Sequence, residues 1–104
     1  MPKYFVIHPT DKKIIKAMVN LPPEKNQLFK KLKASYTSDA DWVRSWAVPE
    51  QEKLYCEWDA KNPEAIREIF DNLEGPAVEI EAIYEMHVIE AEDYKEKVLT
   101  EAIQ

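Results

Sequence analysis

The alternation of apolar and polar residues along the chain predicts four β-strands. Residues 3–8, KYFVIH, are rich in β-branched and aromatic side chains and predict a first strand, which we expect at the centre of a sheet. Residues 41–48 and 53–58 predict a hairpin, joined by the polar segment PEQE at 49–52. A longer stretch over residues 78–89 predicts the last strand. These four segments make up the sheet of the predicted fold.

Helical spacing of apolar residues predicts the elements that cover this sheet. The clearest helix starts behind its N-cap, Asn62, and ends before Gly75. Its apolar stripe consists of Ile66, Ile69, Phe70 and Leu73. An earlier helix is predicted to begin at Pro23, a residue that suits the first helical position. Its apolar stripe consists of Leu28, Phe29, Leu32 and Tyr36. Residues 10–20 fit either a helix capped by Thr10 or an irregular segment.

The order strand, helix, two strands, helix, strand predicts one α+β domain over residues 1–104. With right-handed crossovers this order gives a ferredoxin-like β-α-β-β-α-β sandwich, an antiparallel sheet with both main helices on one face. A C-terminal helix or tail is predicted from about residue 90, most clearly over residues 92–103. A small sheet cannot leave a large apolar face in water, so the main functional question is what lies on the other face.

Strand alternation assigns each side chain to one of the two faces. The face under the helices is predicted to take Phe5, Ile7, Val43, Ala47, Leu54, Cys56, Trp58, Ala82, Tyr84 and Met86. The open face is predicted to take Tyr4, Val6, His8, Trp42, Arg44, Trp46, Tyr55, Glu57, Glu81, Ile83, Glu85 and His87. Aromatic residues bury large areas, and ionisable groups need partners when they leave water. We therefore expect two open faces to pair in a homodimer, a dimeric α/β barrel that encloses a polar cavity.

Five residues of the open face form the candidate ligand-binding set. They are His8, Arg44, Trp46, Tyr55 and Glu81. Arg44 lies between two tryptophans, where its guanidinium group can stack and pair with a carboxylate. His8 is also the candidate metal ligand, with Glu81, Tyr55 or a group from a second subunit completing a site for nickel, zinc or copper. The other histidine, His87, is expected at the opposite end of the sheet, on the order of 15 Å away at ~3.3 Å per residue.

Composition excludes several classes of function. The net charge is −6, and lysines that alternate with acids are not expected to form a basic face for nucleic acid or an anionic membrane. The single glycine, Gly75, excludes a phosphate-binding loop. The single cysteine, Cys56, excludes an intramolecular disulfide and is expected to be buried and inert. The apolar run within MPKYFVIHP is too short for a signal peptide or a membrane span, so we expect a cytoplasmic protein.

The stretch WVRSWAVPEQEKLYCEWDAKNPEAIREIF resembles the central motif of a small family of uncharacterised bacterial and archaeal domains that includes nickel-binding proteins. The matching positions are Trp42, Ser45, Cys56, Asp59, Ala60, Pro63, Glu64, Ala65 and Ile66. FVIHP is similar to the family's opening strand, which ends in histidine at the position of His8. The resemblance implies a ferredoxin-like fold, dimerisation into α/β barrels and a metal role for His8. The chain departs from the family in a longer stretch over residues 10–21, and in having no histidine after the second main helix until His87.

These observations favour a small homodimeric binding protein whose inter-sheet cavity holds nickel, another divalent transition metal or a small organic ligand. A second hypothesis is a structural or interaction domain, in which the aromatic face serves oligomerisation alone and His8 is a hydrogen-bonded structural residue. A third is a cofactor-independent isomerase or monooxygenase-like enzyme of the dimeric α/β-barrel type with His8 as general base. Catalysis ranks last, because no convincing acid–base or nucleophile pair is visible in the sequence.

Overall fold

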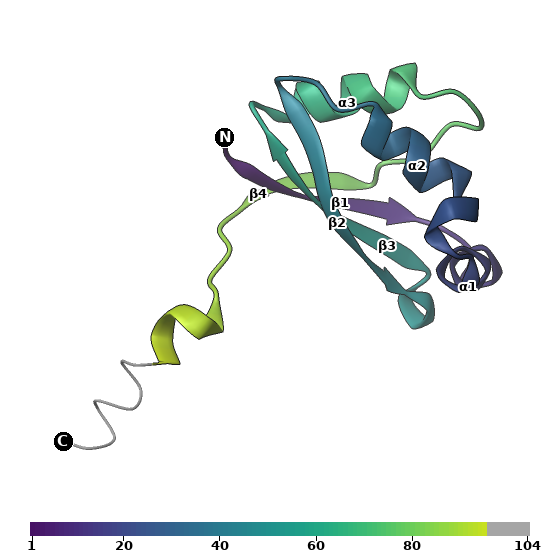
Figure 1. Cartoon of the computed structure of the whole chain (residues 1–104), viewed down its shortest axis with the longest axis horizontal. Helices are drawn as coiled ribbons and strands as arrows, with labels where there is room; N and C mark the ends of the chain where they lie inside the picture. Colours follow the sequence, from purple (N-terminus) through teal and green to yellow (C-terminus); the bar gives the residue numbers. More distant parts are fainter. Residues whose placement is uncertain (96–104) are drawn as a thin grey trace.

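The computed structural model describes residues 1–95, which form a four-stranded antiparallel sheet with α2 and α3 on one face (Figure 1). The strands are β1 (Lys3–Pro9), β2 (Ala40–Val48), β3 (Lys53–Ala60) and β4 (Ala82–Met86), in the order β2-β3-β1-β4 across the sheet. The helices are α1 (Lys12–Asn20), η1 (Pro23–Lys25), α2 (Gln27–Ala34), η2 (Pro49–Gln51), α3 (Pro63–Asn72) and η3 (Ala91–Tyr94). The predicted ferredoxin-like α+β arrangement, with the first strand inside the sheet, is confirmed.

Each main helix begins at a polar side chain that accepts a backbone hydrogen bond. Asn62 caps α3 as predicted, since its side chain accepts from a backbone N–H three residues on, at 2.9 Å. Residues 12–20 form a regular helix, but the cap of α1 is Asp11 and not Thr10. The predicted second helix is divided into η1 and α2, and α2 has Asn26 as its own cap. Because α2 ends at residue 34, Tyr36 lies outside it and is exposed, which corrects its predicted place in the apolar stripe.

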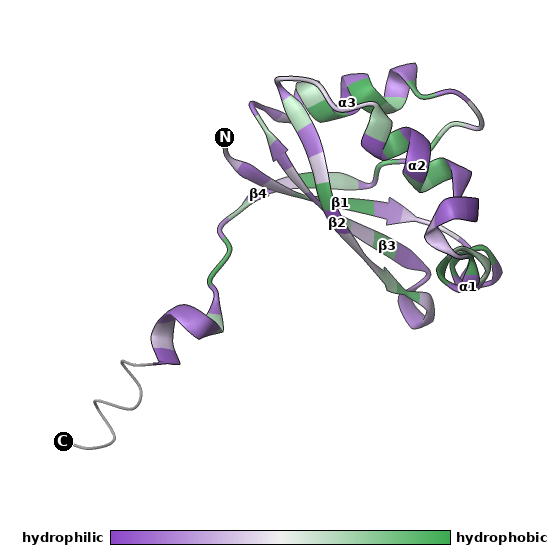
Figure 2. Ribbon diagram, in the orientation of Figure 1, coloured by the Kyte–Doolittle hydropathy of each residue, from purple (hydrophilic) through white to green (hydrophobic). Residues whose placement is uncertain are grey.

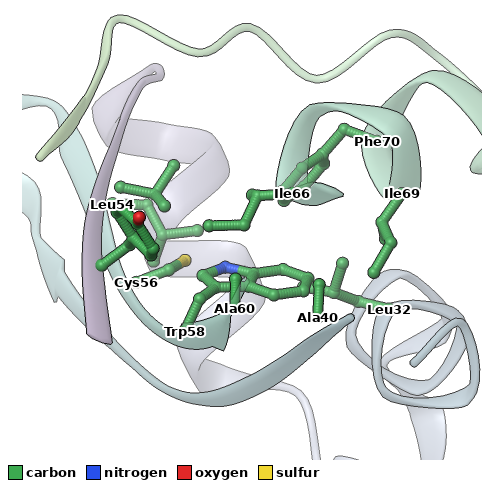
Figure 3. Close-up of a cluster of buried hydrophobic side chains, with 11 residues drawn as sticks. Leu32, Ala40, Leu54, Cys56, Trp58, Ala60, Ile66, Ile69 and Phe70 are labelled. Atoms are coloured by element: carbon green, nitrogen blue, oxygen red, sulfur yellow. The ribbon is translucent and has the colours of Figure 1, made fainter. Parts of the chain in front are cut away.

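The hydrophobic core lies between the sheet and the helices α2 and α3 (Figure 3). Trp58 of β3 is fully buried, and the ring centroid of Phe70 in α3 lies 5.5 Å from that of Trp58. The other buried members are Tyr4, Val6, Leu32, Ala40, Leu54, Cys56, Ala60, Ile66 and Ile69. The ribbons of α2 and α3 alternate between hydrophobic and hydrophilic colour in Figure 2, as expected for helices with one buried side. Burial of these stripes, at about 25 cal/mol per Å² of apolar surface, fixes which face of the sheet the helices cover.

The predicted strand over residues 78–89 is wrong in length, because β4 spans only Ala82–Met86. Its last pair joins Met86 to Lys3, the first residue of β1. Before its start, the carbonyl oxygen of Glu79 accepts from a histidine ring. The strand therefore ends where β1 begins, and a side-chain contact precedes it.

Beyond β4, residues 87–95 lead away from the sheet (Figure 1). This segment contains η3, where the sequence predicts the start of a longer helix over residues 92–103, and residues 96–104 lie outside the described part of the chain. His87 is exposed and follows the end of β4 that pairs with the start of β1, so it lies at the end of the sheet opposite His8, as predicted. Within residues 1–95, no helix has the length and apolar character needed to cross a membrane.

Candidate functional site

The sheet face turned away from α2 and α3, the open face, carries a group of aromatic side chains. Directly opposed residues of antiparallel strands share a face, and the register gives the open-face rows Arg44–Glu57–Phe5–Tyr84, Trp46–Tyr55–Ile7–Ala82 and Asp59–Lys3–Met86. The rings of Phe5 and Tyr55 stack with centroids 5.2 Å apart, and the Trp46 ring lies 6.3 Å from Phe5. Trp46 remains 44% exposed and Tyr84 is more exposed still. Phe5, Trp46, Tyr55 and Tyr84 thus form a partly exposed aromatic group, which we call the open-face patch.

A chain of charged groups centred on Glu57 borders this patch. Lys3 Nζ lies 2.8 Å from a Glu57 carboxylate oxygen and 2.7 Å from one of Asp59, and Arg44 Nε lies 3.2 Å from the second oxygen of Glu57. Hydrogen bonds to Asp59 and Glu57 raise the pKa of Lys3 above its ordinary value. Glu57 is only 5% exposed, whereas the Arg44 side chain is mostly exposed. Glu57 therefore fixes one edge of the guanidinium group and leaves its remaining N–H groups open to a ligand.

Glu81 lies at the hairpin end of the open face. Its carboxylate accepts two hydrogen bonds from Lys53 Nζ, at 2.6 and 2.8 Å, and these bonds raise the pKa of Lys53. The Tyr55 hydroxyl donates to the side-chain oxygen of Gln51 in the adjoining turn. Both side chains are therefore held in place by neighbours, and the negative charge of Glu81 is compensated.

His8 lies on the helix side of the sheet, and its predicted position on the open face is wrong. Its ring is 3% exposed and lies 5.0 Å from the Phe70 ring, centroid to centroid. The Nδ1–H group donates to the Glu79 carbonyl oxygen at 2.9 Å, while Nε2 is buried without a hydrogen-bond partner among residues 1–95. Burial lowers the pKa of His8, so the ring is neutral at neutral pH.

The same inversion affects the whole of β1 and β4. Phe5, Ile7, Ala82, Tyr84 and Met86, predicted to lie under the helices, are on the open face. Tyr4, Val6, His8, Ile83 and Glu85, predicted to lie on the open face, are on the helix side. The predicted faces of Leu54, Tyr55, Cys56, Glu57 and Trp58 in β3 are confirmed. In the open-face patch and its charged border, sequence reasoning therefore missed Phe5, Tyr84 and Lys3.

A β-bulge between Trp42 and Arg44 changes the phase of β2. Trp42 consequently lies on the helix side and not on the open face, where its ring stacks on Phe29 with centroids 5.3 Å apart. Its indole N–H donates to Ser45 Oγ at 2.8 Å, and Ser45 Oγ is 3.0 Å from Cys56 Sγ. Burial raises the pKa of the Cys56 thiol to about 11, so it is protonated, as the prediction of an inert cysteine requires.

The structure thus brings together three of the five predicted ligand-binding residues. Arg44, Trp46 and Tyr55 share the open face, Glu81 lies at its edge, and His8 is separated from them by the sheet. In the part of the chain that the structure describes, no three His, Cys, Asp or Glu side chains are grouped so that they could hold a metal ion. Among residues 1–95, His8 Nε2 and Trp58 Nε1 are buried without a hydrogen-bond partner. An indole N–H is a donor only, so His8 is the one ligand of the two, and a single ligand does not make a transition-metal site. Residues 1–95 of one subunit therefore do not supply the ligand set of a resident nickel ion.

A cleft of about 360 Å³ lies on the helix side, between α3 and the segment that leads to β4. It is lined by Arg67, Phe70, Asp71, Leu73, Gly75, Ala77, Val78 and Ile80. Phe70 connects it to the His8 ring, but no open-face residue lines it. The cleft and the open-face patch are therefore separate features.

The model of one protein family, described as nickel-responsive protein SCO4226-like, matches residues 9–83 of the chain. The match begins just after His8 and ends within β4, so it includes the hairpin and α3. Neither the curated proteins nor the solved structures gave a match.

Proposed function

Because the chain belongs to the nickel-responsive protein SCO4226-like family, we propose that it is a small homodimeric binding protein in which two open sheet faces meet. The observation that supports this proposal is the open-face patch, with its partly exposed tryptophan and tyrosine beside an anchored arginine. Trp, Tyr and Arg are enriched in the cores of protein interfaces. Pairing two such faces covers the aromatic side chains and gives a dimeric α/β barrel with the helices outside.

In this proposal the ligand cavity lies between the two sheets and uses Arg44, Trp46 and Tyr55. The guanidinium group of Arg44, held at one edge by Glu57, has N–H groups left for an anionic ligand. The two aromatic rings offer flat apolar walls, and Glu81 closes the end of the cavity. This arrangement favours a small organic anion that carries an aromatic or apolar part.

Nickel, or another divalent transition metal, is the second ligand class, and its support is the family description. Since residues 1–95 of one subunit group no three donor side chains, a metal site in this proposal takes donors from both subunits. The exposed His87 is available to such a site, whereas the buried His8 reaches a donor of a second subunit only at a contact on the helix side. Their opposite exposure makes them separable by mutation.

Trp46→Asp tests the dimer. Sedimentation equilibrium should give a dimer for the wild type and a monomer for the variant at the same concentration, because an unpaired carboxylate in an apolar interface is costly. Tyr36→Asp is the matched control, since Tyr36 is also an exposed aromatic residue but lies outside the strands of the open face. A wild-type mass that stays monomeric across the concentration range would sink the proposal.

Native mass spectrometry during nickel titration tests the metal class. The wild type is compared with His8→Ala and His87→Ala, which remove the buried and the exposed histidine respectively. Stoichiometric uptake by the dimer that one variant loses identifies that histidine as a ligand. A dimer that takes up no nickel leaves the organic anion as the ligand class to pursue, starting from the Arg44→Ala variant.

A further inference from the structure

The positive charges of this acidic chain are concentrated on α1, η1 and α2. Half of its fourteen lysines and arginines lie in this stretch: Lys12, Lys13, Lys16, Lys25, Lys30, Lys31 and Lys33. Only one acidic residue, Glu24, lies among them, so the expectation that lysines alternate with acids is wrong here. Among the described residues, Lys33 alone of the seven forms an ion pair, with Asp41 at 2.9 Å. Within residues 1–95, the other six lysines therefore lack a carboxylate partner, although the net charge of the chain is −6.

An apolar groove with a volume of about 320 Å³ lies between α1 and α2. It is lined by Met18, Leu21, Pro23, Asn26, Phe29, Lys30 and Lys33, and we call it the α1–α2 groove. Leu21 is exposed in it. Lys30 Nζ, at its rim, donates to the Glu24 carbonyl oxygen at 3.3 Å, a contact that leaves its charge without an acid. A groove of this kind fits a segment that is apolar on one side and acidic on the other.

The chain carries such a segment after β4. Residues 87–104 read HVIEAEDYKEKVLTEAIQ, with five acidic residues and two lysines. In the described part of the segment, Val88 and Ile89 are exposed, Ile89 by 77%, and Glu90, Glu92 and Asp93 follow them. We call residues 87–95 the arm. The arm lies outside the stretch matched by the family model.

We propose that the arm of one copy binds in the α1–α2 groove of a second copy. Val88 and Ile89 contact the apolar floor, and the acidic residues that follow pair with the free lysines. The arm leaves the sheet beside Lys3, whereas α1 follows Pro9 at the other end of β1. The two ends of β1 are roughly 20 Å apart at ~3.3 Å per residue. Figure 1 shows the arm directed away from its own α1, so the groove of another copy is reached without a reversal of the chain.

Charge complementarity within one sequence selects this occupant over other anions. A basic apolar groove also fits an anionic membrane surface or a nucleic acid. The acidic arm, however, is present in equal amount with every groove and supplies apolar residues as well as acids. This contact involves neither Trp46 nor Tyr55, so it stands independently of the open-face dimer.

Disulfide trapping between two separately tagged copies tests the proposal. One copy carries Leu21→Cys in the groove and the other Ile89→Cys in the arm, and they are mixed and mildly oxidised. The native Cys56 is buried and its thiol pKa is raised, so it does not compete. We expect a cross-link between the two tags that weakens at about 1 M salt, where the screening length falls to roughly 3 Å. A Tyr36→Cys copy, exposed but outside the groove, replaces the Leu21→Cys copy as the control.

Two further variants make the result decisive. Lys30→Glu in the Leu21→Cys copy should reduce the cross-linking rate about tenfold or more, because it places like charges opposite each other. Trp46→Asp in both copies should leave the cross-link in place, which separates this contact from the open-face dimer. A yield equal to the Tyr36→Cys control overturns the proposal. Binding to phosphatidylserine vesicles or to single-stranded RNA, unchanged when residues 88–104 are deleted and accompanied by no cross-link, overturns it in favour of that partner.

Discussion

Replacing His8 by glutamine should remove a pH dependence from the stability of the fold. The His8 ring is buried, and burial lowers its pKa below the ordinary value of 6.5. Between the lowered pKa and 6.5, the unfolded chain therefore binds more protons at this position than the folded chain does. Stability from this group is fully present above pH 6.5 and is lost as the pH falls through the folded-state pKa. The loss amounts to at most about 1.4 kcal/mol per pH unit for one proton.

Urea unfolding measured from about pH 5 to about pH 8 checks this expectation. At the upper end, His8→Gln should be less stable than the wild type by about 1–2 kcal/mol, because it loses the ring contact with Phe70 and weakens the bond to Glu79. Below pH 6.5 this gap should narrow, by up to about 1.4 kcal/mol over the first pH unit, since glutamine does not titrate. Carboxylates contribute to both proteins alike and cancel in the difference.

His87→Gln is the matched control, because it removes the other histidine from an exposed position. Its unfolding free energy should follow that of the wild type across the range. A gap between the wild type and His8→Gln that stays constant from pH 8 to pH 5 would refute the reasoning, since it would mean that burial does not oppose protonation of this ring. A gap that widens on acidification would refute it more directly, by showing that the folded state favours the charged form.

Three other changes have defined outcomes. Ser45→Ala should lower the unfolding free energy by about 1 kcal/mol, because it leaves the part-buried Trp42 N–H without its acceptor, and a neutral result in urea would contradict the bond. Asn62→Ala should lower the unfolding free energy by about 1 kcal/mol, because α3 loses its cap. Asn62→Asp should keep most of the wild-type stability, since aspartate also caps helices, and thermal melting compares the two variants. Cys56 should resist a thiol reagent at neutral pH and react in urea, and rapid labelling of the folded protein would contradict its burial and raised pKa.

The element order and the start of α3 were predictable because their signals are local. Asn62 caps the start of α3 with its side chain, and the helix ends at Asn72, before Gly75. The hairpin was equally clear, since its polar turn lies between two strands rich in apolar residues. None of these features depends on residues far apart in the sequence.

The faces of β1 and β4 were not predictable in the same way. Alternation shows which residues share a face, but it does not show which face lies under the helices when both are apolar. Phe5 and Val6 are both good core residues, and tertiary packing places Val6 inside. In β3 the charged residue Glu57 distinguishes the two faces of the strand, and its face was predicted correctly. The bulge near Trp42 is visible only in the structure: the Trp42 N–H donates to Ser45, whereas an unbroken strand would place these two residues on opposite faces.

The corrected phase of β1 changes how the functional hypotheses relate to one another. With His8 on the helix side, a metal at His8 and an organic anion at Arg44 lie on opposite faces of one sheet, and they become independent proposals. Arg44→Ala should then weaken anion binding without changing nickel uptake. His8→Ala should reduce nickel uptake without changing anion binding. If one variant abolished both, the two sites would have to be coupled across the sheet through Glu57 and its neighbours in β3, the strand that pairs with both β1 and β2.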